Sequence, residues 1–87
     1  MEKFKVTSST SPAKLAGAIA NVIREGGDSI EIAAVGAGAV NQAVKAVAIA
    51  RGYLVPCGAD IVVVPSFKDV ILSGVEKTSI VMEVKRA

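Results

Sequence analysis

Histidine and tryptophan are both absent from this chain of 87 residues. Without histidine, the sequence lacks the side chain that most readily transfers protons near neutral pH. The single cysteine, Cys57, cannot form an internal disulfide and has no histidine to activate it as a nucleophile. There is no Cys/His cluster for zinc, and the carboxylates are scattered rather than set at ligand spacing. The sequence therefore predicts no enzyme, no metal or other cofactor, and no small-molecule substrate.

Aromatic residues make up only 3% of the chain, although 52% of its residues are hydrophobic. Alanine, valine and isoleucine supply the bulk, and such small side chains pack in thin layers that leave little room for an enclosed pocket. We expect one small domain over residues 1–87, with surplus apolar surface that favours association between copies. The net charge of +2, from ten basic and eight acidic residues, is low for a protein that grips nucleic acid by charge alone.

Long uncharged apolar runs are also lacking. The longest candidate is interrupted by Lys45 and Arg51, so no membrane-spanning segment is predicted. The first residues, Met1-Glu2-Lys3, are polar and do not form the apolar core of a signal peptide. A lone cysteine suits a reducing compartment. We expect a cytoplasmic protein without a membrane partner.

The sequence does contain regular strand and helix patterns. Residues 3–7 alternate as a half-buried strand, and residues 29–35 alternate as a second strand. Between them, Ser11-Pro12 provides an N-cap followed by proline at the first helical position. Gly26-Gly27 is a helix stop signal. The first half of the chain therefore predicts a strand, a helix and a strand.

In the second half, a glycine turn leads into a helix that we expect to end at Gly52 as its C-cap. Residues 61–64 form an apolar run typical of a central strand, which residues 70–72 extend past a bulge or break at Pro65. A hairpin turn over residues 73–76 precedes an alternating last strand. The order βαβαββ predicts the α/β class in its α+β form, a two-layer sandwich of a mixed four-stranded sheet and two helices.

The second predicted helix has almost no polar surface. A helix that is apolar nearly all round is buried on both sides. On a helical wheel, Val40, Val44 and Val47 form one stripe. The opposite stripe, around Ala46 and Ile49, is more than the sheet of the same chain can cover. We therefore expect a homo-oligomer, a dimer or higher, with these candidate interface residues: Gln42, Ala46, Ile49 and Tyr53.

The run from Gly36 to Gly52, the Ser11-Pro12 helix start and the turn at Pro56–Asp60 together resemble the stage V sporulation protein S family of bacteria. The resemblance covers the whole chain. It implies an Alba-like fold, an oligomeric assembly, and a role in sporulation and septum formation. Nucleic-acid binding is inferred for the family chiefly from its fold. Alba-type chromatin proteins are similar but place lysines in the loop before the first helix, whereas Ser8–Ser11 here carries no charge, which argues against strong DNA packaging.

Within this resemblance, the candidate nucleic-acid contacts are Lys14, Gly36, Gly38, Asn41, Gln42, Lys45 and Lys68. The two glycines open a helix N-terminus that can approach a phosphate, although they serve a tight turn equally well. Neither the dinucleotide motif nor the phosphate-loop motif is complete. The leading interpretation is a non-enzymatic oligomeric module in sporulation and cell-division control that binds DNA or RNA with modest affinity. The alternative is a protein-interaction scaffold with no nucleic-acid role, followed by a small regulator that responds to an anion or nucleotide.

Overall fold

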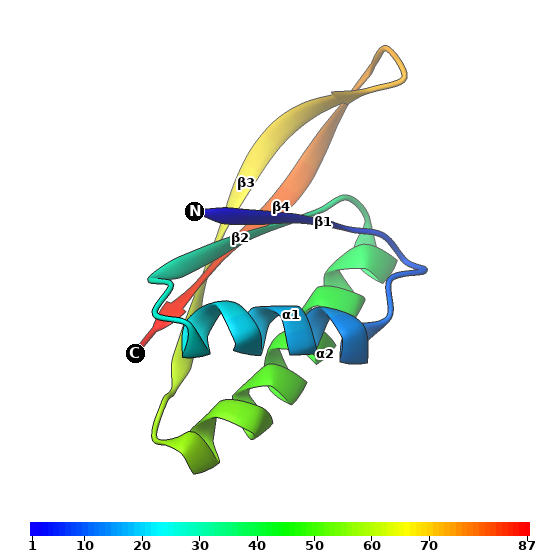
Figure 1. Cartoon of the computed structure of the whole chain (residues 1–87). Helices are drawn as coiled ribbons and strands as arrows, with labels where there is room; N and C mark the ends of the chain where they lie inside the picture. The colour runs from blue at the N-terminus through cyan, green and yellow to red at the C-terminus, as the bar shows by residue number, and fades with distance from the viewer.

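The computed structural model describes residues 1–87 and has the predicted order of elements. The elements are β1 (Glu2–Val6), α1 (Pro12–Arg24), β2 (Ser29–Ala34), α2 (Ala37–Leu54), the short 3-10 helix η1 (Val55–Cys57), β3 (Ile61–Leu72) and β4 (Val75–Arg86). They form two layers, with both helices on one face of a mixed four-stranded sheet (Figure 1). The predicted α+β sandwich is confirmed.

The strands lie in the order β1-β2-β4-β3, with β1 parallel to β2 and with β4 antiparallel to both of its neighbours. The prediction that residues 61–64 form a central strand is wrong, because β3 lies at the edge. The predicted break at Pro65 is also wrong: β3 runs through it, and Pro65 pairs in register with Met82. An edge strand bonds on one side only, so it accepts a proline without losing its ladder.

Helix α1 begins and ends where its sequence signals predict. The Ser11 side chain accepts a hydrogen bond from the Lys14 backbone N–H at 3.3 Å, and Pro12 occupies the first helical position. Beyond the helix, Gly26 adopts a positive φ of 89°, a conformation that glycine adopts without a steric penalty. The inward face of α1 is apolar and buried, and consists of Leu15, Ala16, Ile19, Ala20 and Ile23.

Helix α2 runs two residues past its predicted end at Gly52, to Leu54. Its last carbonyls have other partners. Arg24 Nη2 donates to Tyr53 O at 3.4 Å, and the backbone N–H of Ala59 donates to Leu54 O at 3.1 Å. Gly52 is exposed inside the helix, where glycine weakens the helix but does not end it.

The buried side of α2 consists almost entirely of alanine: Ala39, Ala43, Ala46 and Ala50, followed by Leu54. Ala46 is fully buried in the core of its own chain. It has no surface to offer a second subunit, and the interface prediction is corrected at this residue. Conversely, Val44 from the predicted inward stripe is 54% exposed. Valine and alanine are both apolar on a wheel, so the wheel alone did not separate the inward stripe from the outward one.

Helix α1 packs along one flank of α2 (Figure 1). At its beginning, Gln42 Nε2 donates to Thr10 O at 2.9 Å, just before α1 starts. At its end, Arg24 of α1 reaches Tyr53 O. The flank with Gln42, Ile49 and Tyr53 therefore contacts α1 of the same chain, and the valine stripe lies on the other flank.

The far half of the β3–β4 hairpin projects beyond the rest of the sheet (Figure 1). β2 pairs with β4 only from Ile80 onwards, so residues 68–79, which we call the arm, form a ribbon of two strands. Its turn has two residues, Ser73 and Gly74, with φ of 52° and 76°. Positive φ at both positions matches the twist of a hairpin. The turn is shorter than predicted, because Val75 and Glu76 belong to β4.

Candidate nucleic-acid interface

The face of the sheet that the helices leave open carries a net positive charge. By strand register, it holds five lysines and two glutamates, a net +3: Lys3, Lys5, Lys68, Lys77, Lys85, Glu31 and Glu83. The whole chain has ten basic and eight acidic residues, which leaves five basic and six acidic elsewhere, a net −1. The low total charge of the chain thus conceals a separation of charge between its surfaces.

All three arginines are engaged within the chain. Arg24 and Arg86 donate to the backbone carbonyls of Tyr53 and Ile23, at the ends of α2 and α1. Arg51 binds the Asp60 carboxylate through two hydrogen bonds of 2.7 and 3.1 Å. Cations near a helix C-terminus are favourable, so the arginines stabilise the end of the molecule where the helices finish. The cations left for a polyanion are lysines.

The Arg51–Asp60 pair links the last turn of α2 to the residue just before β3. Hydrogen bonds from Arg51 and from the Ile61 backbone N–H lower the pKa of the Asp60 carboxyl, while Asp60 raises the pKa of Arg51.

Among the lysines, only Lys3 has a carboxylate partner, with Nζ 4.0 Å from Glu31 Oε2.

The loop between β1 and α1 is fixed against the start of α2. Gln42 bonds to Thr10 as described, and Lys45 Nζ donates to Gln42 Oε1 at 3.4 Å. Gln42 was predicted as a nucleic-acid contact, but its amide is engaged in holding this loop. Lys14 and Asn41 are exposed near the two helix starts, as is Lys45. The structure thus brings both helix N-termini and two lysines to one end of the molecule.

Gly36 and Gly38 have different roles. Gly36 is the N-cap of α2 with φ of 91° and no side-chain cap. Gly38 is helical, and a Cβ there would lie only 3.0 Å from Ser8 Cβ. Gly36 therefore provides the turn, whereas Gly38 allows the loop to pack closely.

A groove of about 850 Å³ separates the arm from the body of the protein. Two lysines line it, Lys5 from β1 and Lys77 from β4, and none of its lining residues is acidic. Lys68 of the predicted set lies on the same open face but does not line the groove. Lys5 and Lys77 were absent from the predicted site. The alternation within residues 3–5 and 77–85 places lysines on one face of each strand. Only the order of the strands in the sheet shows that these lysines share one surface.

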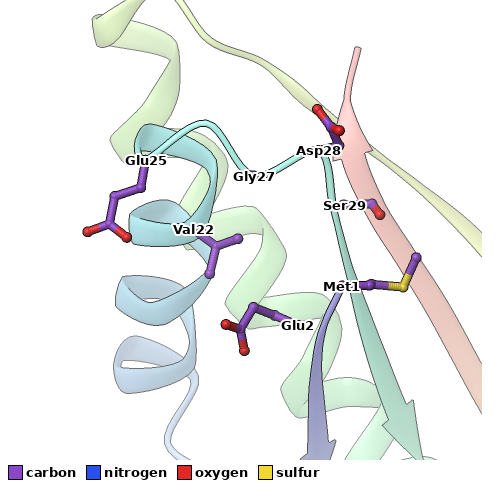
Figure 2. Close-up of a pocket in the computed structure, with 7 residues that line it drawn as sticks. All are labelled: Met1, Glu2, Val22, Glu25, Gly27, Asp28 and Ser29. Carbon is purple, nitrogen blue, oxygen red and sulfur yellow. The ribbon is translucent and has the colours of Figure 1, made fainter.

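A second hollow, of about 520 Å³, lies at the other end between the end of α1 and the starts of β1 and β2. Its acidic residues are Glu2, Glu25 and Asp28. Figure 2 shows these three carboxylates well apart, with Val22 between the two glutamates. They do not form a group that could hold a metal ion.

None of the helices combines the length and hydropathy needed to cross a bilayer.

The family model for stage V sporulation protein S (SpoVS) matches residues 2–87. Among solved structures, Alba from Thermoplasma volcanium is similar, with a TM-score of 0.63 and 14% sequence identity. The match covers 95% of this chain and 98% of that chain. At this identity the likeness shows the fold alone, and the fold is Alba-like, as predicted.

Proposed function

The chain belongs to the stage V sporulation protein S family, which implies a sporulation-related role, and from this we propose a more specific activity. The protein is a non-enzymatic oligomeric module in the control of sporulation and septation, and it binds DNA or RNA with modest affinity. It acts in the cytoplasm and needs no cofactor.

The observation that carries this proposal is that the arginines are bound within the chain, whereas most of the lysines are free to bind phosphate. The arginines are bound to helix ends and to Asp60, whereas four lysines without a carboxylate partner surround the end where the helices begin: Lys5, Lys14, Lys45 and Lys77. Lysine contacts to phosphate supply affinity without sequence information. The expected binding is therefore weak and tolerant of sequence.

The salt dependence of binding measures how many phosphates are neutralised. Each one contributes about −0.9 to the slope of log affinity against log salt on duplex DNA, and about −0.7 on a single strand. A dimer that uses only Lys14 and Lys45 of each subunit should give a slope of about −3 to −4 on duplex DNA, and phosphate contacts by Lys5 and Lys77 would make the slope steeper. A chain that bound through many cations would give a far steeper slope.

The test is a titration of labelled DNA and RNA at several salt concentrations. We expect weak retention at physiological salt, and a further loss in Lys14→Ala and Lys45→Ala that is alike across sequences. Lys3→Ala is the matched control, because Lys3 is paired with Glu31. Failure to bind either nucleic acid at low salt would contradict the proposal.

Exposed apolar side chains support the oligomer and also favour the alternative of a protein-interaction scaffold. Phe67 is 79% exposed and Ile71 is 75% exposed, both on the side of β3 that faces the helix layer. Val44 adds exposed apolar area on α2. A scaffold without nucleic-acid affinity would use these surfaces alone, and the same titration distinguishes the two functions.

A further inference from the structure

We propose that the groove between the arm and the body receives a single strand of nucleic acid and discriminates against a duplex. This inference rests on the proposed nucleic-acid function and names the form of nucleic acid that the protein takes. It assigns the contact to Lys5 and Lys77 on the open face of the sheet, in addition to the lysines at the helix starts.

The charge of the groove fits a phosphodiester chain. Lys5 and Lys77 come from different strands, neither has a carboxylate partner, and no acidic residue lines the groove. Both lie on the face that carries the net +3. Gly36 and Gly38 also line the groove, so the first amides of α2 add a favourable potential for an anion.

The arm gives the groove an apolar wall, and this wall separates the two forms of nucleic acid. Val70, Ile71 and Leu72 line the groove, and Leu72 is 45% exposed. A flexible single strand can place phosphates on the lysines and lay sugar and base faces against this wall. A duplex turns its bases inward and presents phosphates at its surface, so the apolar wall would remain in contact with water.

The dimensions fit a short stretch of strand. A volume of about 850 Å³ is within the range of about 300–1,000 Å³ for pockets that bury a drug-sized ligand. The groove therefore holds a few nucleotides rather than a folded partner. No aromatic side chain lines it, so base stacking, which supplies about 1–3 kcal/mol per base in other single-strand binders, is missing. The affinity should be modest and the sequence preference small.

The experiment compares a fluorescein-labelled 12-nucleotide single strand, as DNA and as RNA, with the blunt duplex of the same sequence. Fluorescence anisotropy at low salt should show tighter binding of the single strand. Lys5→Ala and Lys77→Ala should each weaken single-strand binding by about twofold to fivefold, the range expected for an exposed ion pair. Lys85→Ala is the control, since Lys85 shares the strand and face of Lys77 but lies outside the groove.

A second pair of variants tests the apolar wall. Leu72→Glu places a carboxylate on the wall and should abolish the preference for the single strand. Val62→Glu, on the same face of the same strand but at its other end, should retain that preference. Thermal melts by circular dichroism check that every variant folds.

The outcomes separate this inference from the proposed function. Equal or tighter binding of the duplex, or an effect of Lys5 and Lys77 no larger than that of Lys85, overturns the single-strand groove and leaves nucleic-acid binding intact. Absence of binding for both probes overturns both proposals. If Leu72→Glu changes the molar mass by light scattering and leaves single-strand binding unchanged, the groove is filled by a second copy and the inference is wrong.

Discussion

Gly36 shows how one backbone angle determines where α2 starts. Its φ of 91° lies in a region that other residues rarely adopt, and a Cβ at this position would meet no neighbour. The need for glycine is therefore conformational and not steric. Gly52, by contrast, lies within α2 without a positive φ and also has open space around its Cβ position.

These two glycines form a matched pair for mutation. Gly36→Ala should destabilise the protein by about 1–3 kcal/mol, because a φ of 91° with a ψ of 156° lies in a region that is essentially restricted to glycine. Gly52→Ala should stabilise it by about 0.5–1 kcal/mol, because alanine loses less entropy in a helix. Urea unfolding of both variants measures the difference. A Gly36→Ala variant as stable as the parent would show that the turn can relax.

Asp60 predicts how stability depends on pH. Its pKa is lowered in the folded state by Arg51 and by the Ile61 N–H, so the unfolded state binds its proton more readily. The contribution is therefore present above the ordinary pKa of 3.8 and is lost as the pH falls through the lower, folded value. In Asp60→Asn, the stability of the folded state should therefore fall less steeply than in the parent as the pH is lowered below about 4.

Thermal melts between pH 2 and pH 7 would measure this effect. Glu76→Gln, an exposed carboxylate of the arm without an ion pair, is the control and should leave the acid limb unchanged. If the melting temperatures of Asp60→Asn and of the parent fall equally at acid pH, the ion pair with Arg51 contributes nothing to folding stability.

At the scale of the element, α2 presents one stripe inward, one flank to α1 and one flank outward. The outward flank carries the exposed Val44 beside the partly buried Val40 and Val47. This valine stripe, rather than Ala46, is the part of α2 available to a second copy. Ile49 lies on the flank that contacts α1, so a charge at Ile49 would disturb the fold as well as any assembly.

Val44→Glu should therefore shift the assembly towards monomer, because it would bury an unpaired charge in an apolar contact. Ala13→Glu, at an exposed position of α1 and away from the valine stripe, is the control and should leave the assembly intact. Sedimentation or light scattering at micromolar concentration measures both. A parent chain that is already monomeric under these conditions would contradict the prediction.

The sequence predicted the order and type of every strand and α-helix, because their periodicities are strong and Ser11, Pro12 and Gly26 are reliable end signals. It did not predict that β3 lies at the edge, because an apolar run at residues 61–64 looks the same in a central strand. It placed the end of α2 too early, since Gly52 resembles a C-cap unless the later partners of Tyr53 and Leu54 are known.

The whole molecule is charged unevenly, and this could not be predicted from a total of +2. Lys14 and Lys45 were identified because they are near the helix starts in the sequence. Lys5 and Lys77 are 72 positions apart and come together only because β1, β2 and β4 are neighbours in the sheet. The candidate site was therefore predicted where it is local in sequence and missed where it depends on strand order.

The arm has a further consequence for local dynamics. Apart from the turn residues Ser73 and Gly74, each residue of the arm pairs with one residue across the hairpin and with no third strand. A two-stranded hairpin alone is marginally stable in water. Its amide protons should exchange with solvent through openings that leave the three-stranded part of β4 closed. Val70, Leu72 and Lys77 belong to this segment, so we expect this wall of the groove to open more readily than the three-stranded part of the sheet. A bound single strand would reduce the opening of the arm and slow the exchange of its amide protons. The exchange of amide protons in the core would stay nearly constant.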